Sequence, residues 1–172
     1  RNKLLMIPGP SEVSPDVLNV LSLPLPAHYM DEWAEMFKDV TGMLKSLFGT
    51  ESQPYIITGS GSAGLEAAAA AVIEPGDKVA ADVTGDDVFA PFVEAHGAKL
   101  VRLEIPPGTA LEPDRLRSLL RKEKDVKAIA TCHNITAAGV TNPIKEIAEV
   151  AKEFDALFLA DVISSVGGME IK

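Results

Sequence analysis

The chain has 172 residues, 47% of them apolar, and its 16 Lys and Arg against 25 Asp and Glu give a formal net charge of -9. This length and composition fit one compact core and exclude a disordered chain, and the absence of a basic block makes nucleic acid and an anionic membrane poor partners. The single cysteine, Cys132, excludes an internal disulfide and a multi-cysteine metal site, so we expect no metal.

Two helices are predicted in the N-terminal part. Ser14-Pro15 places a hydroxyl at the N-cap and a proline at the first helical position, and Pro24 and Pro26 end this short helix. Over residues 31–48 apolar side chains recur at helical spacing, and Gly49 supplies a C-terminal stop. The Met and aromatic stripe of this second helix is typical of a core or dimer contact.

Strands and helices alternate in the rest of the chain. Short apolar runs predict five strands, at residues 55–58, 78–83, 98–105, 126–131 and 156–161. Helical periodicity predicts four helices, at residues 62–73, 88–96, 112–122 and 143–154, the last capped by Asn142. This alternation, with short turns, predicts a three-layer α/β fold built on a mostly parallel sheet.

Two polar segments follow the first and the last of these strands. Gly59-Ser60-Gly61-Ser62-Ala63-Gly64 opens a helix, where backbone N–H groups and two serine hydroxyls can hold a phosphate. Asp161 ends the last strand and supplies a carboxylate. Because the carboxyl ends of parallel strands meet at one edge of a sheet, we expect the two segments to face a common ligand. A phosphate at one end and a cationic ring nitrogen at the other describe pyridoxal phosphate (PLP).

The glycine loop has two other interpretations. Gly59, Gly61 and Gly64 follow a predicted strand, and Asp82 lies about 20 residues further on at the end of the next strand, which matches the dinucleotide-binding fingerprint. In that case Asp82 would bind the ribose and Asp161 would have no ligand role. A glycine turn that only begins a tightly packed, Ala-rich helix would show the same pattern.

Seven short segments carry a family resemblance. They are Pro8–Val13, Ile57–Ala63, Leu65–Ala68, Glu74–Val79, Thr136–Val140, Asn142–Ile144 and Asp161–Gly168. In this order they resemble successive landmarks of class V aminotransferases, especially the alanine–glyoxylate and serine–pyruvate aminotransferases. The resemblance implies the large domain of the PLP-dependent transferase fold type I, C-terminally incomplete in this chain.

The resemblance also implies a domain plan. Residues 1–30 would form an N-terminal arm that lines the active-site cleft, and residues 31–172 would form part of the PLP-binding large domain. In the family the Schiff-base lysine lies on a strand beyond the segment of Asp161, and Lys145, Lys152 and Lys172 stand in no matching context. We therefore expect these 172 residues alone to be inactive.

Matching positions imply a cofactor site. Ser60, Gly61 and Ser62 match the loop that contacts the cofactor phosphate, and Asp161 matches the aspartate that pairs with the pyridine nitrogen. A fixed carboxylate keeps that nitrogen protonated, which makes the ring an electron sink. Ile163 matches the apolar residue that packs against one face of the ring.

Other positions have implied roles near the cofactor. Thr136 matches a hydroxyl position near the phenolic oxygen, and Gly9 is expected to line the substrate pocket. Many relatives place an aromatic residue against the second ring face, whereas this chain has the acidic segment Thr84-Gly85-Asp86-Asp87-Val88, with Phe89 as the candidate substitute. His28-Tyr29 resembles a pair found in some members, and either a dimer interface or a surface loop would explain it.

The resemblance implies a PLP-dependent aminotransferase that moves an amino group from a small amino acid, alanine or serine, to a small 2-oxo acid, glyoxylate or pyruvate. Family active sites lie between subunits, so we expect a homodimer. No run approaches the roughly 18 apolar residues of a membrane span, and no signal peptide is apparent, so we expect a cytoplasmic protein. A pyridoxamine–pyruvate-type transaminase, an NAD-binding Rossmann domain of an oxidoreductase and an inactive remnant of the fold remain alternatives.

Overall fold

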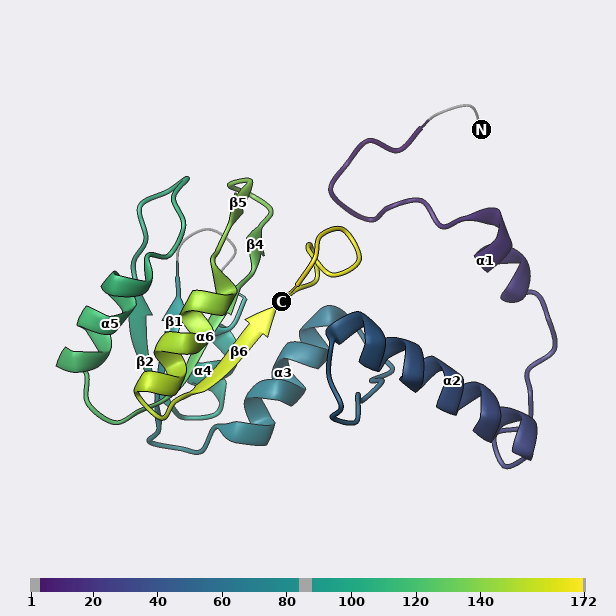
Figure 1. Cartoon of the computed structure of the whole chain (residues 1–172), viewed down its shortest axis with the longest axis horizontal. Coiled ribbons are helices and arrows are strands. Elements are labelled where there is room, and N and C mark those ends of the chain that lie inside the picture. Colours follow the sequence, from purple (N-terminus) through teal and green to yellow (C-terminus); the bar gives the residue numbers. More distant parts are fainter. Residues whose placement is uncertain (1–3, 84–87, 172) are drawn as a thin grey trace. The chain divides into compact units, whose positions relative to one another are not determined.

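A computed structural model of the chain describes residues 4–83 and 88–171. The chain divides into two compact units, residues 1–54 and 55–172 (Figure 1). The division expected at residue 30, between an arm and a partial cofactor-binding domain, rests on the family resemblance and stays a prediction.

The first unit contains the two predicted helices, α1 (Pro15–Val20) and α2 (Asp31–Phe48). The hydroxyl of Ser14 accepts a hydrogen bond from the backbone N–H of Val17 and so caps α1. Gly49 follows α2 with a φ of 59°, a left-handed conformation in which a β-carbon would be strained. The start of α1 and the end of α2 therefore lie at the residues that predicted them.

The apolar stripe of α2 is largely exposed. Met43 is 64% exposed and Leu47 is 48% exposed, whereas Thr41 is buried. The expectation that this stripe forms a core contact or a dimer contact stays a prediction. Across the described ranges, no helix is both long enough and apolar enough to span a bilayer.

The second unit alternates helices and strands. Its elements are α3 (Gly61–Val72), β1 (Lys78–Asp82), α4 (Ala90–Ala95), β2 (Lys99–Leu103), α5 (Pro113–Lys122), β3 (Val126–Cys132), β4 (Asn134–Ile135), β5 (Val140–Thr141), α6 (Ile144–Glu153) and β6 (Leu157–Asp161). Strands β2, β1, β3 and β6 form a parallel sheet in that spatial order, and β4 pairs with β5 in a short antiparallel hairpin. The predicted α/β fold with a mostly parallel sheet is thus confirmed.

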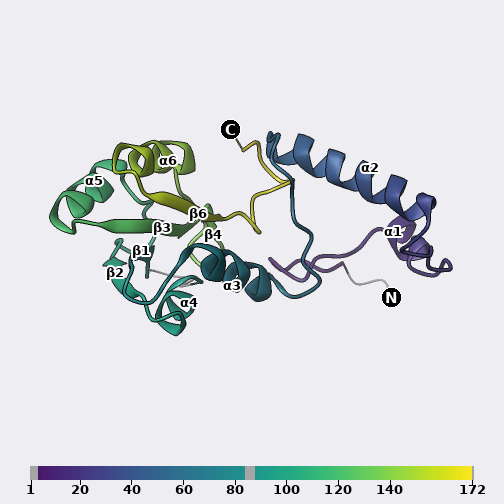
Figure 2. The same cartoon turned by 90° about the horizontal axis from the view of Figure 1, so that it is seen from below.

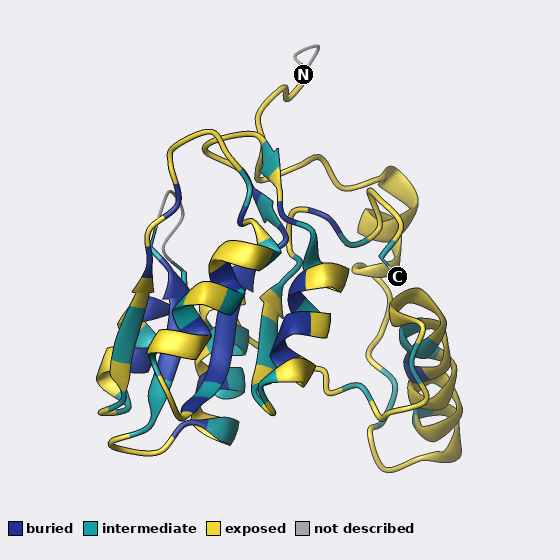
Figure 3. Ribbon diagram, turned by 60° about the vertical axis from the view of Figure 1, so that its left-hand side comes forward, coloured by how far each residue is buried: buried dark blue, intermediate teal, exposed yellow. Residues whose placement is uncertain are grey.

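The parallel sheet lies between two helix layers (Figure 2). Helices α5 and α6 pack on one face, over Ala80 and Ile129, and helices α3 and α4 pack on the other, over Val79 and Ala128. Successive residues of a strand point to opposite faces, so β1 and β3 are buried on both sides and are mostly apolar. Figure 3 shows this core in the central strands and in the inward faces of the helices.

One predicted strand, at residues 55–58, is wrong. The structure assigns no strand there, and Tyr55 is 87% exposed. A strand forms only where a neighbouring strand pairs with its backbone groups, and none of the described residues pairs with this segment. The apolar run expresses a local preference, whereas pairing depends on distant parts of the chain.

The turn that follows β3 also differs from the prediction. The hairpin of β4 and β5 was not predicted, and Asn142 does not cap α6, whose N-cap is Pro143. The buried amide of Asn142 instead accepts a hydrogen bond from the N–H of Leu111 and donates one to the carbonyl of Cys132, both at 2.8 Å. It therefore ties the loop before α5 to the end of β3.

Candidate functional site

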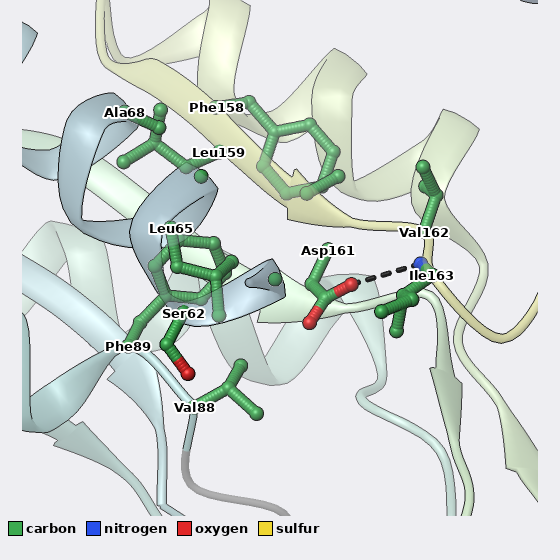
Figure 4. Close-up of a pocket in the computed structure, with 13 residues that line it drawn as sticks. Ser62, Leu65, Ala68, Val88, Phe89, Phe158, Leu159, Asp161, Val162 and Ile163 are labelled. Carbon is green, nitrogen blue, oxygen red and sulfur yellow. Dashed lines mark hydrogen bonds between the residues drawn. The ribbon is translucent and has the colours of Figure 1, made fainter. Parts of the chain in front are cut away.

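A cavity of about 690 Å³ opens beside β6 and the start of α3, within the second unit (Figure 4). The two segments that were expected to share a ligand both line it. Its walls are formed by Gly61, Ser62, Gly64, Leu65, Ala68, Val88, Phe89, Phe158, Leu159, Ala160, Asp161, Val162 and Ile163. The cavity thus reaches the carboxyl end of a parallel strand, where ligands bind in open α/β sheets.

The start of α3 has the properties of an anion site. Ser60 is its N-cap, and the Ser60 hydroxyl accepts a hydrogen bond from the N–H of Ala63 at 3.4 Å. Gly61 and Ser62 are the first two helical residues, and among the described residues their backbone N–H groups have no acceptor. Free N–H groups and the positive end of the helix dipole together favour an anion.

The glycines allow close packing around this helix start. A β-carbon at Gly61 would lie 3.3 Å from Cδ1 of Ile163, and one at Gly59 would lie 2.9 Å from Cβ of Ala63. The start of α3 and the residues after β6 therefore lie close together, and a side chain at position 61 would have to displace the end of the Ile163 side chain.

We expect Gly61→Ala, in the complete gene product that carries these residues, to raise the dissociation constant for PLP about tenfold. The added methyl group would press against Cδ1 of Ile163 and turn that exposed side chain away from its place in the cavity wall. Fluorescence titration measures the constant. Gly42→Ala is the matched control, because Gly42 lies within α2, does not line the cavity, and a β-carbon there meets nothing within 4 Å. Equal constants for the two variants would contradict this account.

Asp161 ends β6 and lines the cavity. Its Oδ1 accepts a hydrogen bond from the backbone N–H of Ile163 at 2.9 Å, drawn as the dashed line in Figure 4. Its Oδ2 lies 4.0 Å from Sγ of Cys132, the residue in register with it on β3. The carboxylate is thus held in one orientation, and it can pair with a cation in the cavity.

The remaining walls of the cavity are mostly apolar. Phe89 is 3% exposed and belongs to the core beneath the sheet, whereas Ile163 is 76% exposed. Phe89 reaches the cavity only as part of its wall, and its stacking on a ring stays a prediction. Apolar walls beside one oriented carboxylate suit a flat ring that carries a cationic atom.

Sequence reasoning missed the apolar wall residues Leu65 and Leu159. Leu65 entered only within a family landmark and a predicted helix, and Leu159 only within a predicted strand; both also pack against the core. Helical spacing was the available signal, because positions 61, 65 and 68 lie on one face of α3.

Several predicted positions lie outside this cavity. Thr136 is not among its lining residues, and the Thr136 hydroxyl lies 2.9 Å from the hydroxyl of Ser164. Gly9 belongs to the first unit, and its substrate role stays a prediction. The rings of His28-Tyr29 meet edge to face, 5.2 Å apart between centroids. Residues 84–87, where an aromatic residue was sought, lie outside the described residues.

The geometry argues against the dinucleotide-binding fingerprint. That fingerprint needs a strand before the loop and a third glycine packed closely between helix and strand. Residues 55–58 form no strand, and a β-carbon at Gly64 would meet no neighbour within 4 Å. Asp82 is 8% exposed, so its side chain is largely withdrawn from the surface that a ribose would occupy.

Comparisons with known proteins identify the family. The sequence profile of the family Aminotransferase class-V matches residues 26–172. An uncharacterized aminotransferase of Methanocaldococcus jannaschii is 43% identical over 168 residues, which cover 96% of this chain and 44% of that protein. Alanine–glyoxylate aminotransferases are also among the matches.

Solved structures agree with this result. The ureidoglycine–glyoxylate aminotransferase of Bacillus subtilis matches with a TM-score of 0.90 and 33% identity, over 100% of this chain and 46% of that one. The pyridoxamine–pyruvate aminotransferase of Mesorhizobium loti matches with a TM-score of 0.91 and 26% identity, over 98% of this chain and 44% of that one. The chain spans less than half the length of these relatives. By sequence and by structure, it belongs to the class-V aminotransferase family.

Proposed function

We propose that the complete gene product carrying these residues is a PLP-dependent aminotransferase that moves an amino group from a small amino acid to a small 2-oxo acid. One observation carries the proposal: a single cavity is lined by the free N–H groups at the start of α3 and by the Asp161 carboxylate. The family implies PLP as the cofactor. Because the chain spans less than half of its relatives, the proposal concerns the complete protein.

The residues of the cavity fit this cofactor. A phosphate suits the backbone N–H groups of Gly61 and Ser62 and the hydroxyl of Ser62, all in the cavity wall; Ser60, the N-cap just before them, does not line the cavity, and its contact to the phosphate stays a proposal. A ring nitrogen suits the carboxylate of Asp161, and a ring face suits the exposed side chain of Ile163. When bound, PLP supplies an electron sink that stabilises negative charge at the substrate α-carbon.

In this proposal Asp161 holds a proton on the ring nitrogen. The hydrogen bond from the N–H of Ile163 fixes the carboxylate before any ligand arrives. A fixed negative charge favours the protonated form of a neighbouring base. An electrostatic partner that is oriented in advance costs no reorganisation during the reaction, which is why such groups have large effects on rate.

We propose alanine or serine as the amino donor and glyoxylate or pyruvate as the acceptor. The relatives include a ureidoglycine–glyoxylate transaminase, an L-aspartate–glyoxylate aminotransferase and alanine–glyoxylate aminotransferases, whose names share glyoxylate. The amino donors in these names differ, so the proposed acceptor is better supported than the proposed donor. Gly9 and Thr136 stay the proposed contacts to the substrate and to the phenolic oxygen.

A pyridoxamine–pyruvate transaminase is the second candidate, because the Mesorhizobium loti enzyme has the same fold over this region. Assays of the complete protein with alanine, serine or pyridoxamine as donor, each paired with glyoxylate and with pyruvate, separate the two candidates. Turnover with pyridoxamine alone would favour the second.

We also propose that the protein is a cytoplasmic homodimer and that its Schiff-base lysine lies beyond residue 172. The exposed apolar stripe of α2 supports a subunit interface, and the single, buried Cys132 suits a reducing compartment. Analytical ultracentrifugation of the complete protein tests the dimer. Borohydride reduction with bound PLP, followed by peptide mass mapping, tests the lysine.

We expect the complete protein to bind PLP and not NAD in equilibrium dialysis. Pyridoxal lacks the phosphate and should bind at least about tenfold more weakly, because it forgoes charge-assisted hydrogen bonds at the start of α3. Ser62→Ala should reduce the difference in affinity between PLP and pyridoxal. Ser118 is an exposed serine of α5, and Ser118→Ala should leave this difference unchanged. Retention of NAD without PLP would refute the cofactor, and equal binding of PLP and pyridoxal would refute the phosphate site.

A further inference from the structure

Two side-chain bridges join the residues after β3 to the loop after β6. In the outer bridge the hydroxyls of Thr136 and Ser164 lie 2.9 Å apart, and both residues are exposed. In the inner bridge Nδ1 of His133 lies 2.9 Å from Oγ of Ser165, and these residues are 6% and 1% exposed. Neither His133 nor Ser165 lines the cavity.

The other partner of Ser165 determines which atom donates in the inner bridge. The hydroxyl of Ser165 donates a hydrogen bond to the carbonyl of Val162, with 3.1 Å between the two oxygens. A hydroxyl has one proton, so the serine oxygen accepts in the bridge and Nδ1 of His133 donates. Burial lowers the pKa of His133 below its usual range and so favours a neutral ring. The ring proton then lies on Nδ1.

The bridge spans the segment that carries the cavity groups. At one end the backbone N–H of His133 donates to the carbonyl of Asp161 at 2.7 Å. At the other end the backbone N–H of Ser165 donates to the carbonyl of Val162 at 3.0 Å. Between them lies Ile163, whose N–H holds the Asp161 carboxylate. A shift of Ser165 would therefore move the group that orients the carboxylate.

We infer that His133 is a positioning residue: through Ser165 it fixes the loop 161–165 and thereby orients Asp161 and Ile163 in the cavity. The inference rests on the proposed function, because the orientation matters only if these groups hold PLP.

Five variants of the complete protein test the inference. His133→Leu removes the donor, Ser165→Ala removes the acceptor, a double variant combines these two changes, and His133→Asn keeps an amide N–H near the position of Nδ1. Ser118→Ala is the control, because it removes an exposed hydroxyl that also donates to a backbone carbonyl, that of Asp114 at 2.9 Å. For each protein the dissociation constant for PLP, the absorption spectrum of bound PLP and the thermal midpoint are measured.

We expect His133→Leu and Ser165→Ala each to raise the dissociation constant about three- to tenfold and to shift the absorption maximum of bound PLP. Both changes arise because the carboxylate loses its fixed orientation. His133→Asn should stay within about twofold of the wild type, because one hydrogen bond is kept. The double variant His133→Leu with Ser165→Ala should bind PLP as tightly as the single variant with the larger dissociation constant, since both substitutions remove the same hydrogen bond.

A purely structural role would lower the thermal midpoint but leave the dissociation constant and the spectrum at wild-type values, and that result overturns the inference. Equal values for His133→Leu and His133→Asn overturn it as well. If His133→Leu does not fold, Ser165→Ala decides by the same criteria. Failure of the wild-type protein to bind PLP has a different meaning, because it refutes the proposed function and removes the basis of the inference with it.

Discussion

Asp161→Asn should slow amino-group transfer from alanine to glyoxylate by about 10²- to 10³-fold or more in the complete protein. The neutral amide cannot keep a ring nitrogen protonated, so the electron sink is lost. The fold should persist, because the amide oxygen of asparagine can still accept the hydrogen bond that the N–H of Ile163 donates at 2.9 Å. Single-turnover stopped-flow measurements isolate the proton-abstraction step from substrate binding.

Asp155→Asn is the matched control for this variant. Asp155 is exposed, lies just before the other end of β6 and has a φ of 54°, a conformation that asparagine tolerates. Asp155→Asn therefore removes one negative charge, as Asp161→Asn does, at a position outside the cavity. A wild-type single-turnover rate for Asp161→Asn would remove Asp161 from its proposed role, whatever the steady-state rate.

Local signals were enough to predict most elements of the second unit. The range 112–122 was predicted as a helix, and α5 covers Pro113–Lys122; the range 126–131 was predicted as a strand, and β3 covers Val126–Cys132. Amphipathic spacing and a buried apolar run are properties of the element's own residues, so they can be read without the rest of the chain.

Features that depend on distant residues could not be predicted in this way. Residues 55–58 have the composition of a strand, yet a ladder needs a partner, and no described residue supplies one. Asn142 is a suitable N-cap type directly before a helix, but its amide reaches Leu111 and Cys132 instead. Only the folded arrangement places those two backbone groups beside it.

The sequence was enough to predict which two segments form the candidate site, but it was not enough to predict the side-chain contacts around them. The glycine-rich helix start and the end of β6 both line the cavity as expected, although the expectation from strand ends holds only for β6, because residues 55–58, before the glycine loop, form no strand. The roles of Ser60, Asp161 and Ile163 come from family resemblance and stay proposals. The pair His133 and Ser165 is 32 residues apart in sequence, and no spacing rule connects them.

Asn142→Leu should lower the free energy of unfolding of the second unit by about 2–5 kcal/mol, because a buried polar group that loses its partner costs about 1–3 kcal/mol. The substitution removes the acceptor of the N–H of Leu111 and the nearer of two donors to the carbonyl of Cys132, both at 2.8 Å; the hydroxyl of Thr131 lies 3.4 Å from the same carbonyl. Leu111 and Asn142 are 0% and 1% exposed, so water does not replace the lost bonds at this site. Such a loss is a large part of the roughly 5–15 kcal/mol by which domains are stable.

Hydrogen exchange followed by mass spectrometry of the complete protein measures this effect where it arises. The peptide that contains the amide of Leu111 should exchange much faster in Asn142→Leu, and the thermal midpoint should fall. Asn134→Leu is the matched control, because that half-buried amide makes a hydrogen bond to the hydroxyl of Thr141 at 3.0 Å where water can substitute. Its expected cost is below about 1 kcal/mol. If both variants lower the midpoint equally, burial is not what makes Asn142 important, and the link between the loop before α5 and the end of β3 is weaker than its hydrogen bonds indicate.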